Sequence, residues 1–190
     1  MIDLDKIYRA ERGRVLASLI RLLGGFELAE DALAEAFLAA AQQWPREGVP
    51  ANPRTWLISA GRFKAIDKLR KSGRFRNIAP ELTRQLELEE DQLPPDREVI
   101  EDDTLRLIFT CCHPALPLDA QIALTLREVC GLTTEEIAAA YLSKPSAIAQ
   151  RIVRAKSRIR DAALPYEVPP PAEWPQRLDA VLHTVYLIFN

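Results

Sequence analysis

Helical periodicity runs through almost the whole chain, and it limits the fold more than any other feature of the sequence. Apolar residues recur every three or four positions, and no segment alternates convincingly as a half-buried strand would. Proline and glycine clusters divide the periodic stretches. The pattern predicts an all-α protein with helices over 3–23, 27–44, 53–71, 101–112, 118–130, 134–141, 144–162 and 174–189.

Charge divides the chain further, although the net charge is only −2. Residues 1–76 carry 14 Lys and Arg against 9 Asp and Glu, residues 77–103 carry 2 against 10, and residues 104–163 carry 8 against 5. Two basic modules flanking an acidic segment suggest contact with nucleic acid at both ends. We therefore expect a helical domain over 1–76, an acidic linker over 77–101, a second helical domain over 102–163, and a proline-rich segment with the start of a helical extension over 164–190.

Local signals around residue 140 predict two helices joined by a tight turn. Thr133 and Glu136 have the spacing of a capping box, with Leu132 and Ile137 placed as its hydrophobic staple. After the turn, Ser143 can cap the next helix and Pro145 can occupy its first turn, where the missing N–H costs nothing. A short helix, a tight turn and a basic second helix are typical of a helix-turn-helix that binds DNA.

The second of these helices has separate apolar and cationic faces. At about 100° per residue, the isoleucines at 148, 152 and 159 fall on one side with Ala155 and should face the core. Arg151, Arg154 and Arg158 form another stripe, which includes Ala147 and borders Gln150. In a major groove, such arginines can reach phosphates while Gln150 reads a base edge. The alternative is a solvent-facing helix whose arginines only maintain solubility.

The first basic module ends in an aromatic and cationic segment over residues 52–71, most of it the expected helix 53–71. Its predicted buried face comprises Leu57, Ile58, Gly61, Ala65 and Leu69. Trp56 and Phe63 fall on another side, beside lysines and arginines, so they can stack on unstacked bases while the cations hold the backbone. Packing of these aromatic residues against helix 27–44 is the competing interpretation.

Several motifs together resemble the extracytoplasmic-function sigma factors of bacterial RNA polymerase. AEDALAEAF at 29–37, Trp44 and RTWLISAGRFKAID at 54–67 are similar to conserved region two of that family. The stretch from LREVCGL to KSRIR at 126–160 is similar to its region four. The acidic linker, the CCHP at 111–114 and the proline-rich tail resemble a subset that carries a helical C-terminal extension.

The resemblance implies a transcription-initiation factor and a role for each segment. Helix 27–44 resembles the element that binds the clamp of the polymerase β′ subunit, with Asp31, Glu35 and Gln42 in matching positions. Region four would bind the β flap, and an anti-sigma factor or the extension is a possible regulator. The implied residues for the melted minus-ten element are Arg54, Trp56, Phe63, Lys64, Arg70 and Lys71. Those for the duplex minus-thirty-five element are Lys144, Ser146, Ala147, Gln150, Arg151, Arg154 and Arg158.

Two departures from the family pattern bear on DNA recognition. Leu142 stands where many helix-turn-helix turns have glycine, and Ala147 and Ala149 replace residues that often hydrogen-bond DNA. These departures bear on which sequence the upstream reader prefers. The runner-up function is a stand-alone helix-turn-helix regulator that binds duplex DNA without polymerase. Only the sigma-factor interpretation predicts polymerase binding and strand opening.

Enzymatic and metal-dependent classes have little support in the sequence. No phosphate-binding glycine loop, HExxH motif or catalytic triad is visible, and the chain has only two histidines. Cys111, Cys112, His113 and Cys130 lack the CxxC spacing of structural zinc sites, so we expect no metal and no cofactor. We expect Cys112 and Cys130 to be small core residues, His113 to close its helix and His183 to be packed. A thiol or zinc sensor is the third class. Without a signal peptide or membrane span, the chain reads as cytoplasmic.

Overall fold

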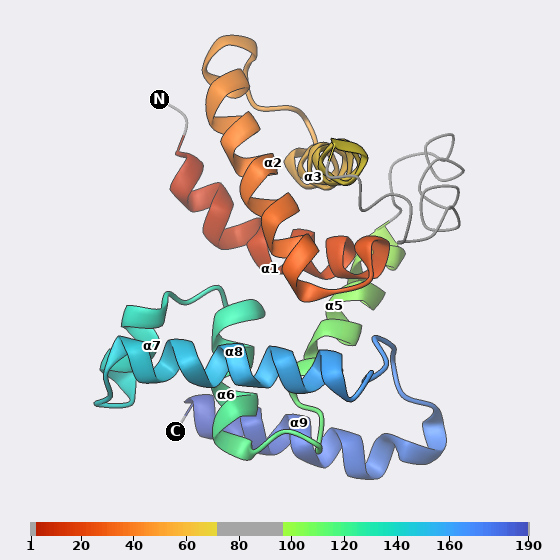
Figure 1. Cartoon of the computed structure of the whole chain (residues 1–190), viewed down its shortest axis with the longest axis vertical. Coiled ribbons are helices and arrows are strands. Elements are labelled where there is room, and N and C mark those ends of the chain that lie inside the picture. Colours follow the sequence, from red (N-terminus) through yellow and green to blue (C-terminus); the bar gives the residue numbers. More distant parts are fainter. Residues whose placement is uncertain (1–2, 72–96, 190) are drawn as a thin grey trace. The chain divides into compact units, whose positions relative to one another are not determined.

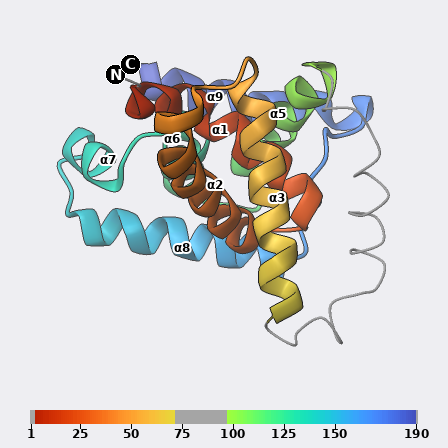
Figure 2. The ribbon, with the colours of Figure 1, turned by 90° about the horizontal axis from the view of Figure 1, so that it is seen from above.

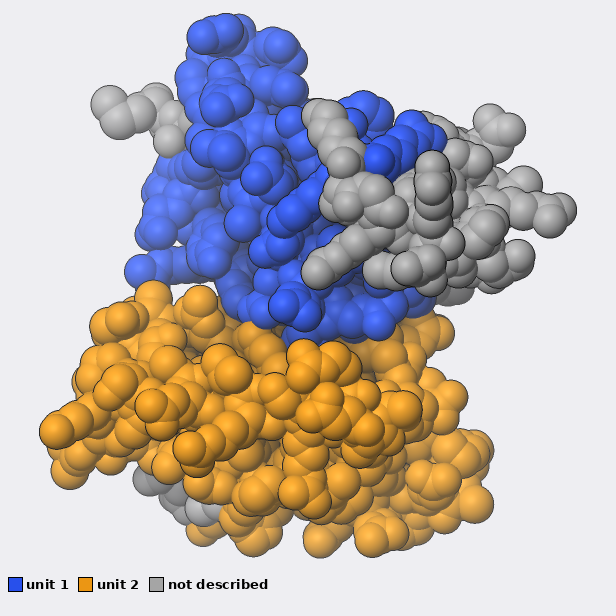
Figure 3. All heavy atoms as spheres, viewed as in Figure 1, with its two compact units in different colours: residues 1–101 blue, residues 102–190 orange. Residues whose placement is uncertain are grey.

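The computed structural model describes residues 3–71 and 97–189, and it divides into two compact units (Figure 3). Unit 1 comprises residues 1–101 and unit 2 residues 102–190. The described residues form helices, turns and loops without a strand, so the predicted all-α fold with two helical domains is confirmed. No described helix combines the length and the apolar character needed to cross a membrane.

Unit 1 is built on three helices, α1 (Leu4–Leu23), α2 (Phe26–Glu47) and α3 (Pro53–Lys71), which pack against one another (Figures 1 and 2). Asp3 caps α1 by accepting the backbone N–H of Lys6 at 3.0 Å. Gly24 ends α1 with a φ of 79°, a left-handed conformation that favours glycine. The sharp reversal at Gly24 therefore brings α2 back along α1.

Small residues let the helices of unit 1 approach closely. A Cβ added at Gly61 would lie 3.0 Å from the Ala32 carbonyl oxygen on α2 and 3.2 Å from Leu19 Cδ1 on α1. Leu16, Leu19 and Leu57 are fully buried in this unit. Because cores pack at crystal-like density, a larger residue at Gly61 would push α3 away from both neighbours.

Unit 2 contains most of α5 (Arg97–Cys111), followed by α6 (Leu118–Glu128), α7 (Thr134–Ala140), α8 (Pro145–Asp161) and α9 (Trp174–Phe189). Helix α6 is its centre, because α7, α8 and α9 all pack against it. Helices α7 and α8 meet at a tight turn, and α8 then extends along the unit (Figures 1 and 2). The core includes Leu107, Leu124, Ile137 and Ile148, all fully buried.

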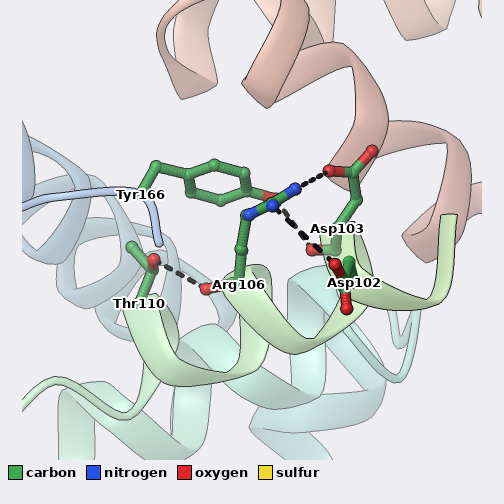
Figure 4. Close-up of polar contacts among 5 residues, drawn as sticks. All are labelled: Asp102, Asp103, Arg106, Thr110 and Tyr166. Carbon is green, nitrogen blue, oxygen red and sulfur yellow. Dashed lines mark hydrogen bonds and ion pairs between the residues drawn. The ribbon is translucent and has the colours of Figure 1, made fainter. Parts of the chain in front are cut away.

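A polar cluster ties the segment after α8 to α5 (Figure 4). The fully buried Asp103 carboxylate lies 2.6 Å from Arg106 Nη1, while the exposed Asp102 is 3.9 Å from Arg106 Nη2. The Tyr166 hydroxyl donates to the Asp103 carbonyl at 3.2 Å, and the Thr110 hydroxyl donates to the Arg106 carbonyl at 2.8 Å. A buried carboxylate is stable only when it is paired, so Arg106 holds this part of unit 2 together.

Helix α9 packs within unit 2 through buried polar side chains. Its buried residues include Arg177, which donates to the Phe109 carbonyl at 3.0 Å, and Thr184, which donates to Gln121 Oε1 at 3.3 Å. Leu182 and Tyr186, by contrast, are each 64% exposed. The expectation that His183 is packed is wrong, because its side chain is exposed.

Several predicted helix bounds are corrected. We expected helix 27–44 to stop before Pro45, but α2 continues to Glu47, because proline removes only its own N–H and the Gly48 N–H still donates to the Trp44 carbonyl at 2.8 Å. Helix α5 begins at Arg97, so the last residues of the expected linker 77–101 are helical, and residues 72–96 lie outside the described residues. Ser143 does not cap α8, whose N-cap residue is Lys144.

The turn between α7 and α8 contains a strained residue. Leu142 has a φ of 48° and a side chain that is 98% exposed, so it adopts a left-handed conformation without gaining any packing. We expect Leu142→Gly to stabilise the protein by about 1 kcal/mol in urea denaturation followed by circular dichroism. Leu142→Ala is the control, since alanine keeps the Cβ. Equal stabilisation by both substitutions would show that the exposed leucine side chain, and not the left-handed backbone, destabilises the protein.

Candidate nucleic-acid and partner interfaces

The predicted helix-turn-helix is present in unit 2, with its capping box formed. The Glu136 N–H donates to Thr133 Oγ1 at 3.1 Å, and the Thr133 N–H donates to Glu136 Oε2 at 2.7 Å. Pro145 occupies the first turn of α8, as expected. Local chemistry therefore fixes the start of each helix, since the capping box begins α7 and Pro145 begins α8.

The two faces of α8 are as the periodicity predicts. Ile148, Ile152, Ala155 and Ile159 are buried against the unit. The candidate residues Lys144, Ser146, Ala147, Gln150, Arg154 and Arg158 are all exposed. Val153, which the sequence reasoning missed, is also 61% exposed. The outward face thus offers cations, a hydroxyl, an amide and apolar groups, the types of group that contact phosphates and base edges in a major groove.

Arg151 differs from the other arginines of this stripe. Its Nε lies 3.0 Å from Asp119 Oδ2 on α6, and its side chain is only 30% exposed. A second ion pair joins the same helices, where Lys156 Nζ lies 2.8 Å from Oε1 of the fully buried Glu128. Helix α8 is therefore held on α6 by two charged contacts as well as by its apolar face.

Helix α3 of unit 1 presents one aromatic side chain to solvent. Leu57, Ile58, Gly61 and Ala65 are buried, as predicted, but Leu69 is only partly buried. Phe63 is 64% exposed. Lys64 and Arg70 are exposed as well, and the side chain of Lys71 lies outside what the structure describes. An exposed ring between cations is an arrangement that can stack on an unpaired base.

Two other candidates on α3 are engaged within unit 1. Trp56 is only partly exposed and packs edge-to-face on Trp44 of α2, with ring centroids 5.3 Å apart. Arg54 pairs with Glu11 of α1 through Nε at 2.5 Å and Nη2 at 3.3 Å. The expectation that Trp56 projects away from packing is therefore corrected, because a single-helix wheel cannot show where Trp44 of α2 lies.

An exposed stripe runs along α2. Asp31, Glu35 and Gln42 are exposed, and Leu38 between them is 53% exposed. The four residues are spaced at i, i+4, i+7 and i+11, so they share one face. The sequence reasoning missed Leu38, although this spacing could have identified it.

Lys68 of α3 pairs with one residue of this stripe. Lys68 Nζ lies 2.7 Å from Asp31 Oδ2, and both side chains are more than half exposed. The hydrogen bond to Asp31, with the charges of Asp31 and Glu35, raises the pKa of Lys68. Exposed pairs of this kind contribute little to stability, so Asp31 can exchange Lys68 for a basic partner at small cost.

The three cysteines lie in different environments. Cys111 and Cys112 are buried, and burial raises the pKa of both thiols. Cys130 is exposed, which corrects its expected place in the core. His113 follows α5 and accepts the Ala115 N–H at Nδ1, 3.1 Å away. Among the described residues, no three His, Cys, Asp or Glu side chains are placed to hold a metal ion.

Comparisons with known proteins match both units. The family model for Sigma-70 region 2 matches residues 7–75, and that for Sigma-70 region 4 matches residues 106–159. An uncharacterized protein of Rhizobium meliloti is 42% identical over 192 residues, covering 100% of this chain and 45% of the relative. No solved structure gives a significant match.

Two further relatives carry the names of sigma factors. A probable RNA polymerase sigma factor of Haemophilus influenzae is 30% identical over 124 residues, which cover 58% of this chain and 64% of the relative. The ECF RNA polymerase sigma factor SigE of Mycolicibacterium smegmatis is 27% identical over 158 residues, which cover 83% of this chain and 60% of the relative. The chain thus spans between 45% and 64% of the length of these relatives.

Proposed function

The chain belongs to the sigma-70 family, in its extracytoplasmic-function group, and on that basis we propose that it directs RNA polymerase to specific promoters at the start of transcription. The observation that carries the proposal is the combination of two family regions with different exposed surfaces. A helix-turn-helix presents a cationic face, while a separate helical bundle presents both an exposed aromatic ring and an acidic stripe.

Unit 2 would read duplex DNA upstream of the start site. Helix α8 is long enough to lie in a major groove, and its apolar face is fully used in packing on the unit. Its exposed Arg154 and Arg158 would contact phosphates, with Gln150 at a base edge. The same unit would bind the polymerase β flap, a proposal that depends on the family resemblance alone.

Unit 1 would stabilise melted DNA at the minus-ten element. Phe63 is the side chain best placed to stack on an unpaired base, and Lys64 and Arg70 lie on the same helix to contact the backbone. Trp56 and Arg54 would stabilise this surface from within unit 1, because Trp56 packs on Trp44 and Arg54 pairs with Glu11.

The stripe of Asp31, Glu35, Leu38 and Gln42 would bind the clamp of the polymerase β′ subunit. A half-exposed leucine between two carboxylates and an amide suits a partner helix that offers basic residues around an apolar position. We further propose that the chain acts in the cytoplasm as a transcription factor and not as an enzyme, and that an anti-sigma factor or a C-terminal extension regulates it.

Transcription in a reconstituted system tests the proposal. Core RNA polymerase from the source organism is incubated with fragmented genomic DNA, with and without the purified chain, and the 5′ ends of the transcripts are mapped. We expect a small set of start sites that depend on the chain. Duplex binding without any association with core polymerase would instead identify a stand-alone regulator. A thiol or zinc sensor would instead bind metal stoichiometrically or lose its activity in Cys112→Ser.

Loss of the Phe63 ring should impair strand opening selectively. We expect Phe63→Ala to lower the extent of open-complex formation by about tenfold, since stacking on one base contributes roughly 1–3 kcal/mol, and to leave closed-complex binding almost unchanged. Permanganate reactivity of unpaired thymines measures opening. Tyr186→Ala is the matched control, because Tyr186 is also 64% exposed but lies on α9. Equal losses in both variants would contradict the assignment.

A further inference from the structure

Arg151 is held by contacts that Arg154 and Arg158 do not share. Its Nε lies 3.0 Å from Asp119 Oδ2, and its side chain is 30% exposed, whereas the other two arginines of the stripe are exposed. Asp119 lies in the first turn of α6, with 57% of its side chain exposed. A carboxylate at that position also interacts favourably with the helix dipole, which helps to keep it in place.

A tyrosine in the turn before α8 responds to the charges of the same pair. Tyr141 follows α7 at the start of the turn and is 36% exposed. Burial raises the pKa of Tyr141, the positive charge of Arg151 lowers it, and the negative charge of Asp119 raises it. The ion pair with Asp119 thus ties Arg151 to α6, so fewer of its rotamers are open to it.

An arginine restrained at Nε is suited to one kind of contact. The ion pair uses the side of the guanidinium, and the two Nη amino groups at its end still offer N–H donors. Those two groups match the O6 and N7 acceptors of guanine in a major groove. Restraint also lowers the entropic cost of ordering a long side chain, which is largest for arginine and lysine. A phosphate contact needs no such restraint, and the exposed Arg154 and Arg158 can supply it.

We infer that Asp119 is a positioning residue that directs Arg151 end-on to a guanine in the upstream duplex element. This inference depends on the proposed function, because it assumes that α8 enters the major groove of promoter DNA. It assigns Arg151 to sequence recognition and not to general electrostatic attraction, and it makes Asp119 part of promoter specificity although its own charge repels DNA.

The charge of Asp119 allows a clear test, because the two roles predict opposite changes in DNA affinity when that charge is removed. If Asp119 acts only as a negative charge near DNA, Asp119→Asn will tighten binding. If it positions Arg151, the same substitution will weaken binding to the preferred sequence. Asp161→Asn is the matched control, since Asp161 is an exposed carboxylate at the end of α8 that pairs with Arg160.

The experiment uses the full chain with core RNA polymerase. A random-sequence duplex library is enriched on the holoenzyme, and each guanine of the enriched sequence is replaced in turn by 7-deazaguanine, which lacks the N7 acceptor. We expect the replacement at one position to lower the affinity of the wild-type holoenzyme roughly tenfold. That sensitivity should fall below about twofold in Arg151→Ala and in Asp119→Asn, and Asp119→Glu should restore part of it. Asp161→Asn should retain the full effect.

The outcomes separate this inference from the proposed function. Affinity for unselected duplex, measured for every variant, reports whether α8 still folds and binds. Retained sensitivity to 7-deazaguanine in Asp119→Asn, or in Arg151→Ala, would overturn the inference while leaving the proposed function standing. Failure of the holoenzyme to enrich any duplex would overturn the proposed function, and the inference would fail with it.

Discussion

Replacing Arg154 and Arg158 together with alanine will lower the affinity of the holoenzyme for promoter duplex by about a hundredfold at low salt. Both side chains are exposed on the outward face of α8. A charge-assisted hydrogen bond to phosphate contributes about 1.5–3 kcal/mol, and exposed side chains lie at the lower end of that range, so loss of two such contacts amounts to roughly two orders of magnitude. The slope of log affinity against log salt concentration should fall by about two, because each phosphate contact contributes about 0.9. Fluorescence anisotropy across a salt series measures both quantities.

Arg160→Ala is the control for this double substitution. Arg160 lies on the same helix, is exposed and pairs with Asp161, but falls outside the cationic stripe. Its replacement should change the salt slope by much less than one. An unchanged slope in the double variant would mean that the stripe does not contact phosphates, and α8 would then be an ordinary solvated helix.

Asp103→Ala will destabilise unit 2 by roughly 3 kcal/mol. The substitution removes a fully buried carboxylate and leaves Arg106, whose side chain is 27% exposed, without its closest partner. Breaking one partner of a buried pair usually costs about 3–5 kcal/mol, and the partial exposure of Arg106 places the expected loss at the lower end. Hydrogen exchange should therefore accelerate at amides of α5 to α9. The amides of α1 to α3 act as an internal reference.

Asp102→Ala is the matched control for that loss. Asp102 also faces Arg106, but at 3.9 Å and with 62% of its side chain exposed, so its removal should cost at most about 0.5 kcal/mol. Similar destabilisation by both substitutions would mean that Arg106, and not the buried Asp103 carboxylate, organises the cluster.

Most of the helices could be predicted from the sequence, because their signals are local. The capping box of Thr133 and Glu136, the proline at 145 and the buried isoleucines of α8 all act within one or two turns of backbone. Two helix bounds were predicted wrongly, because local signals alone do not determine where a helix begins or ends. Pro45 was expected to end its helix, yet α2 continues to Glu47, and α5 begins at Arg97 and not at Glu101.

The candidate interface was harder to predict, because the same residue type has different partners at different positions. Trp56 and Phe63 share a helix and a predicted face, but Trp44 of α2 covers only the first of them. Arg54 and Arg151 carry the same charge as Arg154, but Glu11 and Asp119 engage them. No periodicity within one helix contains this information.

The sequence by itself determined the all-α fold, the helix-turn-helix, the division of charge and the family, since each depends on neighbours in the chain or on motif spacing. The tertiary structure decided which cations and aromatic rings are exposed and which are held. That distinction depends on side chains 12 to 43 positions apart, as for Trp56 with Trp44, Arg151 with Asp119 and Arg54 with Glu11. Such contacts form only when helices pack, so they follow from the packing of the helices and not from the order of residues within any one helix.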